Sequence, residues 1–339
     1  MLEKPNLQDE KIVTCLQNAF GVPVAQLAFL PLGADRDTFV YRAVTSEDTA
    51  YFVKLRRGVF NEIVVTLPKF LFDQGIQQII PPLTTKTGQL WASLDAFTVM
   101  LYPFIEGRNG YEVPLTEQQW QEFGAALKRI HTTELPPSLA SRIPQETYSP
   151  HWRELAKHFL ARLETETFTD PIASQLAAFL QTKRTEVHEL IDRTERLAQL
   201  LQAQPPATVL CHFDVHAGNL LLTSTGALYI VDWDNPLFAP KERDLMFIGG
   251  GQLGDWQTPQ AEEKLFYASY GQTEIDPVAM AYYRYERIID DIAVECEQIL
   301  SPHAGDLNRE QELKFLMSNF LPNSVLALAY QSDKTQFNQ

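Results

Sequence analysis

The sequence is poor in cysteine, in basic residues and in long apolar runs. Its three cysteines, Cys15, Cys211 and Cys296, form no CxxC pair, so neither a disulfide framework nor a structural zinc site is indicated. No apolar run approaches the length of about 18 residues that a membrane-spanning helix needs. Residues 1–6 lack the apolar segment of a signal peptide. Together these absences predict a protein of a reducing compartment, the cytoplasm, with no membrane partner.

Basic residues are outnumbered, 28 Lys and Arg against 43 Asp and Glu, which gives a net charge of -15. A nucleic-acid partner is therefore not expected, because phosphate backbones are bound by Lys and Arg stripes. An acidic surface suits a cationic small-molecule substrate, and it equally suits a protein that is merely kept soluble. The sequence also lacks a Walker A motif, which disfavours a P-loop kinase. No pattern indicates an oligomeric state.

The segment 212–219, His-Phe-Asp-Val-His-Ala-Gly-Asn, is the most informative feature present. Two short apolar runs follow it, at 220–222 and 228–231, and the turn residues 223–226 separate them. This pattern predicts a β-hairpin. The start of the first strand and the end of the second lie side by side in a hairpin, so Asn219 and Asp232 are expected at one edge. Asp214 is expected on the loop that leads to it.

Two oxygen donors at one edge suit Mg²⁺, which takes few protein ligands together with phosphate oxygens. A carboxylate a few residues upstream suits a group that orients or deprotonates an attacking hydroxyl. The alternative is structural, with an Asp that caps a turn and an Asn that tolerates a left-handed backbone.

This segment resembles the catalytic loop of the aminoglycoside phosphotransferases, a family of eukaryotic-like kinases. Their loop reads His-x-Asp-x-x-x-x-Asn, and a second Asp replaces the Asp-Phe-Gly of protein kinases. Here the second position reads Val231-Asp232-Trp233-Asp234, without Phe-Gly. The resemblance implies ATP and Mg²⁺ as cofactors, Asp214 as the catalytic residue, and Asn219 and Asp232 as metal ligands.

Periodicity along the chain predicts an α+β architecture. Strands are expected at 25–30, 39–44 and 50–55, as an antiparallel meander, and at 90–92 and 97–102, with helices at 9–20 and 61–74. From residue 115 the pattern is mainly helical, with helices near 151–166, 173–201, 259–271, 276–300 and 309–319. We therefore expect a bilobal, protein-kinase-like fold. Its small antiparallel-β nucleotide-binding lobe would span 1–103, and its large helical catalytic and substrate-binding lobe 104–339.

The resemblance also suggests nucleotide-binding residues. Lys54, at the end of the run Tyr51-Phe52-Val53, resembles the kinase lysine that pairs with phosphates, although a strand Lys is more often exposed to solvent. Glu62 is the candidate partner that holds Lys54. The turn 33–38 would cover the phosphates with backbone N–H groups of Ala34 to Thr38, ordered by Thr38 or Asp37. The segment from Tyr102 through Phe104 to Gly107 would face the adenine, unless it is an ordinary strand exit.

The acceptor side is less defined. Segments such as 148–154 and 239–251 extend the resemblance over most of the chain, and it implies phosphorylation of a hydroxyl on an aminocyclitol or aminoglycoside antibiotic, with spectinomycin as the foremost candidate and resistance as the result. Asp234, Tyr282 and Glu286 are candidate contacts for a cationic substrate, although an acidic helix face over aromatic residues is also ordinary packing.

Three further residues are expected to support the loop. Arg243, between Glu242 and Asp244, would tie the following helix to the catalytic loop, with Asp244 as structural support and His212 as a scaffold. His216 stays ambiguous.

Two other functions remain open from the sequence. One is a small-metabolite kinase of the same fold, acting on choline, homoserine or methylthioribose. The other is a catalytically silent pseudokinase, which is disfavoured because Lys54, Asp214, Asn219 and Asp232 are all present.

Overall fold

The computed structural model describes residues 4–33, 37–254, 256–300, 309–322 and 324–333. The chain forms two compact units. The first comprises Met1–Ile143 and Gly218–Pro236, and the second comprises Pro144–Ala217 and Leu237–Gln339. The first unit contains the whole predicted nucleotide-binding lobe together with the predicted hairpin. The lobe boundary at residues 103 and 104 stays a prediction.

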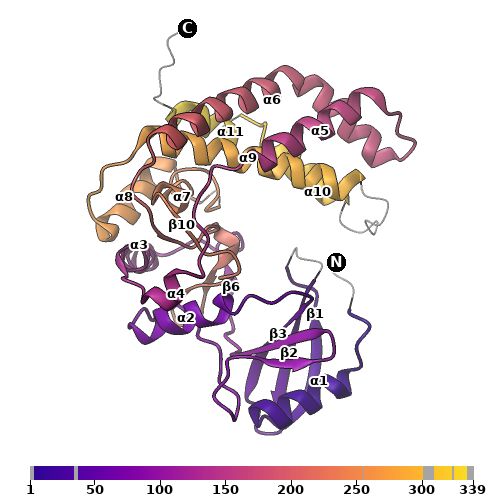
Figure 1. Ribbon diagram of the computed structural model, residues 1–339, viewed down its shortest axis with the longest axis vertical. Coiled ribbons are helices and arrows are strands. Elements are labelled where there is room, and N and C mark those ends of the chain that lie inside the picture. The colour runs from indigo at the N-terminus through magenta and orange to yellow at the C-terminus, as the bar shows by residue number, and fades with distance from the viewer. Residues whose placement is uncertain (1–3, 34–36, 255, 301–308, 323, 334–339) are drawn as a thin grey trace. The chain divides into compact units, whose positions relative to one another are not determined.

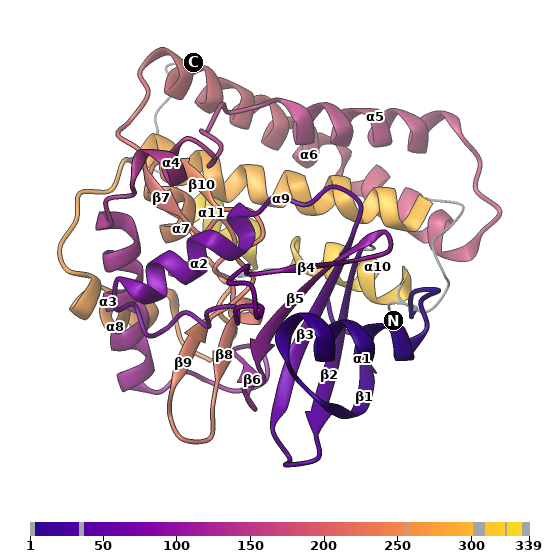
Figure 2. The same cartoon turned by 60° about the horizontal axis from the view of Figure 1, so that its bottom comes forward.

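A five-stranded antiparallel sheet dominates the first unit, in the order β1-β2-β3-β5-β4 (Figure 2). Its first three strands form the expected meander. The strands are β1 (Val24–Leu30), β2 (Thr38–Thr45), β3 (Ala50–Arg57), β4 (Ala92–Leu94) and β5 (Phe97–Pro103).

One face of this sheet is covered by the N-terminal helix α1 (Asp9–Cys15) and the π-helical turn η1 (Leu16–Phe20). Ile12 and Leu16 are fully buried against alternate residues of β3, among them Val53 and Leu55. Successive strand residues point to opposite faces, so the residue between Val53 and Leu55 projects away from this core. That residue is Lys54.

The fourth strand lies two residues later than expected, at 92–94 and not at 90–92. Leu94 pairs with Phe97, which leaves Asp95 and Ala96 as a two-residue connection. Asp95 has φ 52°, the left-handed conformation that tight hairpins favour and that Asp tolerates. The turn therefore fixes the register of the strand, and a prediction from apolar content alone placed it too early.

The rest of the first unit surrounds the predicted hairpin. Strands β8 (Leu220–Leu222) and β9 (Leu228–Ile230) pair antiparallel, and β6 (Arg108–Asn109), which was not expected, extends them to three strands. Helix α3 (Glu117–Thr132) packs on β9 and begins with a capping box between Thr116 and Gln119. The remaining helices are α2 (Ile63–Asp73) and α4 (Pro137–Ala140).

The second unit is helical and is centred on α9 (Pro277–Leu300). Helices α5 (His151–Thr165), α6 (Pro171–Ala203) and α10 (Arg309–Ser318) pack on α9, as do α7 (Glu242–Leu245) and α11 (Val325–Ser332), and α5, α6 and α9 run alongside one another in Figure 1. Asp170 caps α6 and Pro171 opens it. Helix α8 (Pro259–Tyr270) and a pair of strands, β7 (Val209–Cys211) and β10 (Leu237–Ala239), complete the unit.

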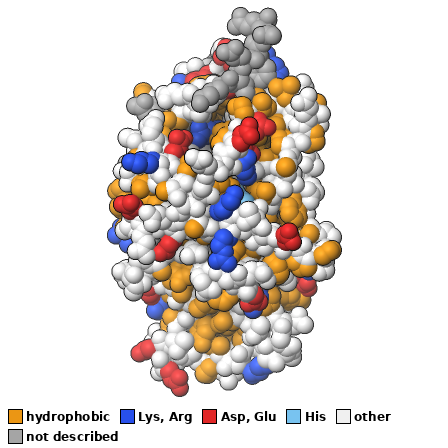
Figure 3. Space-filling model, turned by 90° about the vertical axis from the view of Figure 1, so that its left-hand side faces the viewer, with side chains coloured by type: hydrophobic (Ala, Val, Ile, Leu, Met, Phe, Trp, Pro, Cys, Tyr) orange, Lys and Arg blue, Asp and Glu red, His pale blue; other side chains and the backbone are white. Residues whose placement is uncertain are grey.

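Within the described part of the chain, no helix is long and apolar enough to cross a membrane. On the face shown in Figure 3, acidic and basic side chains are dispersed among neutral ones, and the surplus of acids gathers into no continuous patch there.

Candidate active site

The lysine of β3 is the centre of the polar cluster in the first unit. Lys54 Nζ lies 2.7 and 2.8 Å from the two carboxylate oxygens of Asp234, and 3.2 Å from Asp232 Oδ1. The Lys54 side chain is 13% exposed. Burial opposes its charge, but the attraction of Asp232 and Asp234 outweighs burial, so the pKa of Lys54 is raised above its ordinary value. Lys54 therefore stays protonated and paired with the two aspartates.

Asp234 was predicted to contact a substrate. In this structure it has two basic partners, because Arg56 Nη1 also lies 3.3 Å from its Oδ2. Substrate contact by Asp234 stays a prediction. Asp232 is different, because its side chain is 51% exposed. Of these two acids, Asp232 has the carboxylate that is open to a ligand.

The hairpin brings Asn219 and Asp232 together as expected. The ladder of β8 and β9 pairs Leu220 with Ile230, and one more hydrogen bond, from Val231 N to Asn219 O at 3.0 Å, extends it. Asp232 follows directly, with φ 66°. A left-handed backbone is uncommon for a residue other than glycine and is typical of functional sites.

These two side chains fit a magnesium ion by their chemistry. An amide oxygen and a half-exposed carboxylate flank the end of one ladder, and Mg²⁺ takes a small number of such oxygens. Asn219 and Asp232 are the residues that would hold it.

The catalytic-loop aspartate belongs to the second unit, where both of its oxygens have basic neighbours. Arg287 Nη1 lies 2.8 Å from Asp214 Oδ1, and His216 Nε2 lies 3.3 Å from Asp214 Oδ2. Burial alone would raise the pKa of this carboxyl, but His216 and Arg287 hold it well below its ordinary value. Asp214 is therefore a carboxylate at any physiological pH.

The loop that carries Asp214 is held by Asp244, as predicted. The fully buried carboxylate of Asp244 accepts the backbone N–H groups of His212 and Phe213, each at 2.8 Å. Phe213 has φ 87°, and the guanidinium of Arg243 stacks 3.7 Å from the centre of its ring. His212 Nδ1 accepts the backbone N–H of Asp214 at 3.3 Å, which confirms its scaffold role. The conformation that presents Asp214 is thus fixed from several directions.

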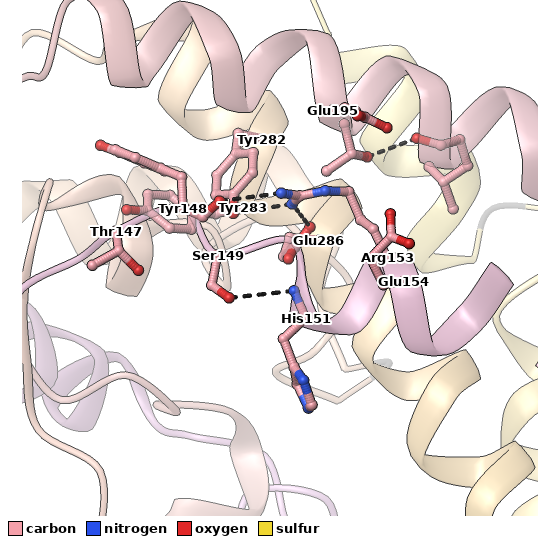
Figure 4. Close-up of polar contacts among 12 residues, drawn as sticks. Thr147, Tyr148, Ser149, His151, Arg153, Glu154, Glu195, Tyr282, Tyr283 and Glu286 are labelled. Atoms are coloured by element: carbon pink, nitrogen blue, oxygen red, sulfur yellow. Dashed lines mark hydrogen bonds and ion pairs between the residues drawn. The ribbon is translucent and has the colours of Figure 1, made fainter. Parts of the chain in front are cut away.

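The predicted substrate residues of α9, Tyr282 and Glu286, lie in a buried cluster around Arg153 (Figure 4). Arg153 Nη1 donates to Glu286 Oε2 at 2.5 Å and lies 3.4 Å from the Tyr282 hydroxyl. Its Nη2 donates to the carbonyl of Tyr148 at 3.1 Å. Arg153 is 2% exposed, so the cluster fastens the start of α5 to α9. Substrate contact by Tyr282 or Glu286 stays a prediction.

The remaining predicted residues lie in the first unit. Glu62 stands at the N-terminus of α2 and lies 3.1 Å from Arg142, so in this structure Glu62 and Lys54 have different partners. Thr38 is buried and opens β2. Ala34 to Arg36 of the predicted phosphate-covering turn lie outside the described residues, and Asp37 binds Arg57.

The predicted hinge begins at the end of β5. The ring of Tyr102 lies against Phe52, and the ring of Phe104 contacts Phe52 and the guanidinium of Arg42. The backbone N–H of Phe104 donates to Ala50 O at 3.2 Å, so this bond continues the strand pairing past Pro103. A role in adenine binding stays a prediction.

A family model described as the phosphotransferase enzyme family matches residues 29–281, about three quarters of the chain. The chain belongs to this family. Within it, a crystal structure of spectinomycin phosphotransferase, APH(9)-Ia, in complex with ADP and spectinomycin is similar at TM-score 0.91 and 36% sequence identity, over 98% of this chain and 100% of the other. The AMP-bound complex of the same enzyme matches at TM-score 0.85 and 35% identity, over 96% and 99% of the two chains.

A further similar protein is more distant in sequence. Protein StrN of Streptomyces griseus is 25% identical over 288 residues, which are 83% of this chain and 82% of StrN. The predicted fold class and kinase activity are confirmed by these likenesses. The protein is a phosphotransferase with a protein-kinase-like fold, an antiparallel sheet near its N-terminus and a helical C-terminal region.

Sequence reasoning missed two arginines that contact predicted site residues, Arg153 and Arg287. Both bind predicted site residues that are far away in the chain, Glu286 and Asp214 respectively. The spacing of Arg287 and Asp291, one helical turn apart, was the local signal available for the second.

Proposed function

We propose that this phosphotransferase transfers the γ-phosphoryl group of ATP to a hydroxyl group of spectinomycin and so gives resistance to it. The observation that carries the proposal is the likeness to spectinomycin phosphotransferase, which spans nearly the whole of both chains at 36% identity. Likenesses that show only a fold leave the acceptor open. One of this extent, which includes the helical part of the chain, supports the acceptor too.

In the proposed reaction, Asp214 orients the acceptor hydroxyl and takes its proton late. The transition state of phosphoryl transfer is loose, so a weakly basic carboxylate suffices and its placement matters more than its basicity. This agrees with a carboxylate whose pKa is held below the ordinary range. The two hydrogen bonds that Asp244 accepts from the loop backbone also support the placement of Asp214.

Lys54 would bind phosphate oxygens of ATP, and Asn219 and Asp232 would hold Mg²⁺. When bound, the metal neutralises charge that develops on the phosphates. Lys54 is charged and ordered before the nucleotide arrives, so little reorganisation is needed. Thr38, Glu62, Tyr102 and Phe104 complete the proposed nucleotide site.

The acceptor carries two secondary amines that are cationic near neutral pH, and carboxylates or aromatic rings suit them. Asp234, Tyr282 and Glu286 remain the proposed contacts. Their present partners, Lys54 for Asp234 and Arg153 for the other two, imply that contact with substrate requires an exchange of partners.

The test is ADP release by purified protein with Mg-ATP and separate acceptors: spectinomycin, streptomycin, kanamycin, choline and homoserine. We expect turnover with spectinomycin, and its loss in Asp214→Asn with ATP binding retained. Asp192→Asn, which changes an exposed aspartate of α6, is the matched control. Turnover with choline or homoserine alone would move the function to a small-metabolite kinase of the same fold. Silence with every acceptor would contradict both.

A cell-based measurement separates resistance from catalysis. Expression in a susceptible bacterium should raise the inhibitory concentration of spectinomycin, and Asp214→Asn should abolish the increase. Turnover in the test tube without any protection of cells would contradict a resistance role while leaving the chemistry intact.

A further inference from the structure

The arginine of α9 that contacts Asp214 is itself held from its other side. Arg287 Nη1 lies 2.8 Å from Asp214 Oδ1, and Arg287 Nε lies 3.1 Å from Asp291 Oδ1, one helical turn further along α9. Asp291 is 7% exposed, and its second oxygen accepts from Asn319 Nδ2 at 3.4 Å. A guanidinium between two carboxylates can turn less than one with a single partner.

We propose that Arg287 is a positioning residue of the phosphotransfer reaction, which fixes the orientation of the Asp214 carboxylate through an anchored Asp291–Arg287–Asp214 bridge. The inference rests on the role of Asp214 in the proposed function. It adds a residue from a helix 73 positions further along the chain, outside every motif of the catalytic loop.

The geometry explains why one arginine suits this place. Its guanidinium reaches both acids, with Nη1 at 2.8 Å from Asp214 and Nε within ion-pair distance, 3.1 Å, of Asp291. A lysine, with its single ammonium, cannot match this. The bond to Oδ1 also restricts rotation of the Asp214 side chain. His216 Nε2 lies 3.3 Å from Oδ2 from within the loop, so basic groups restrain both oxygens of the carboxylate.

The charged groups around Asp214 determine in which direction its pKa is shifted. His216, Arg287 and Arg243 favour the ionised carboxylate, whereas Asp290 and Asp291 repel it. Burial also disfavours the charge. Removing Arg287 leaves burial and both acids in place, and His216 and Arg243 remain as the opposing groups. The pKa of Asp214 should therefore rise from its depressed value.

The decisive variants are Arg287→Met, which keeps much of the volume and removes the charge, and Arg287→Lys, which keeps the charge and removes the fork. We expect kcat for phosphotransfer to fall about 10- to 100-fold in both, as for a displaced base, while KM for ATP stays within about twofold. The acid limb of kcat/KM against pH should move upward in Arg287→Met. Arg287→Lys should keep the limb near that of the wild type. Arg309→Met, which removes an ion pair to Asp170 elsewhere in the second unit, should change neither readout.

The results would differ if Arg287 stabilised the fold without positioning Asp214. Arg287→Met and Arg287→Lys would then lose thermal stability and active fraction alike, with the acid limb unmoved, and the proposal would be overturned. Unchanged kcat in both variants would overturn it as well. Active-site titration with a tight-binding nucleotide gives the folded fraction, so a folding defect is not mistaken for slow turnover.

A readout without an acceptor keeps this inference separate from the proposed function. In protein labelled with ¹³C at aspartate carboxyls, the Asp214 signal is assigned by its loss in Asp214→Asn and is then titrated. An upward move of its midpoint in Arg287→Met supports the bridge even if spectinomycin is no substrate. An unchanged midpoint contradicts the bridge even if spectinomycin is phosphorylated.

Discussion

Lys54 donates to both carboxylate oxygens of Asp234, at 2.7 and 2.8 Å, and lies farther from Asp232, at 3.2 Å. Two aspartates separated by one residue thus have different tasks in this structure. Asp234 binds the lysine closely, and Asp232, about half exposed, keeps a carboxylate open. Arg56 adds a second positive charge beside Asp234.

This division predicts the behaviour of Asp234→Asn. A neutral amide holds Lys54 weakly, so the lysine shifts to Asp232 and competes there with Mg²⁺. We expect the Mg²⁺ concentration for half-maximal activity to rise about 3- to 10-fold, which corresponds to roughly 0.7–1.4 kcal/mol. The loss of activity should shrink at saturating metal. Asp73→Asn, which alters a lysine pair on α2, serves as control. Equal metal dependence in wild type and Asp234→Asn would refute the competition.

Asp244→Asn tests the support of the catalytic loop. The asparagine amide has the shape of the carboxylate but only one acceptor oxygen. Its NH₂ group would therefore face one of the two backbone N–H donors. The loss of a charge-assisted bond to a buried group costs about 2–3 kcal/mol. Urea unfolding should show that loss, together with a fall in kcat. If stability fell and kcat per folded molecule did not, the bonds from Asp244 would stabilise the fold without placing Asp214.

Arg153 and Glu286 can be tested by a double-mutant cycle. Arg153→Met alone leaves a buried carboxylate without its partner and should cost about 3–5 kcal/mol. Burial already raises the pKa of Glu286 to about 7 despite the arginine. Adding Glu286→Gln removes the stranded charge and should recover much of the loss in urea unfolding. Additive losses would show that the two side chains are not coupled.

Glu295 should make stability fall as pH rises. Burial, with repulsion from Glu312, raises the pKa of Glu295 to about 9 in the folded protein, from 4.5. A folded state that holds its proton more tightly is fully stabilised below pH 4.5 and loses that stabilisation progressively up to about pH 9. The melting temperature should therefore drop between pH 6 and 9, and the drop should be smaller in Glu295→Gln, whose amide needs no ionisation.

The neighbouring exposed Glu297 provides the comparison on the same helix. Glu297→Gln should keep the pH dependence of the wild type. If Glu295→Gln had the same pH dependence as the wild type, a group other than Glu295 would be responsible for it.

The hairpin, with Asn219 and Asp232 at its edge, was predictable because its determinants are local. Turn residues 223–226 set the loop length, and the two-residue periodicity of strands sets which positions meet at the edge. Asp244 was predictable for a similar reason, since an acid at the start of an apolar helix has few other roles. The strand at 92–94 was misplaced because one left-handed aspartate, Asp95, decides its register, and apolar content carries no trace of that conformation.

Contacts between residues far apart in the sequence were harder to predict. Glu286 and Arg153 are 133 residues apart, and Asp214 and Arg287 are 73 apart, so nothing near either acid in the sequence indicates its partner. Whether Lys54 lies closer to Asp232 or to Asp234 depends on small differences in side-chain placement, 3.2 Å against 2.7 Å. The part of the site that depends on backbone pattern was therefore predicted, and the part that depends on packing of distant helices was not.

The left-handed backbones of Phe213 and Asp232 have a consequence for how this sequence can change. Each conformation is costly for a residue with a Cβ atom, by about 1–2 kcal/mol, and glycine would relieve that cost at either place. Yet glycine would remove the ring on which Arg243 stacks in one case and a proposed metal ligand in the other. Selection for stability alone would thus drive both positions toward glycine, and their persistence as Phe and Asp would have to be maintained by selection for turnover. In a library randomised at these two codons, survivors of a heat challenge and survivors of an antibiotic challenge should separate into different sequence populations.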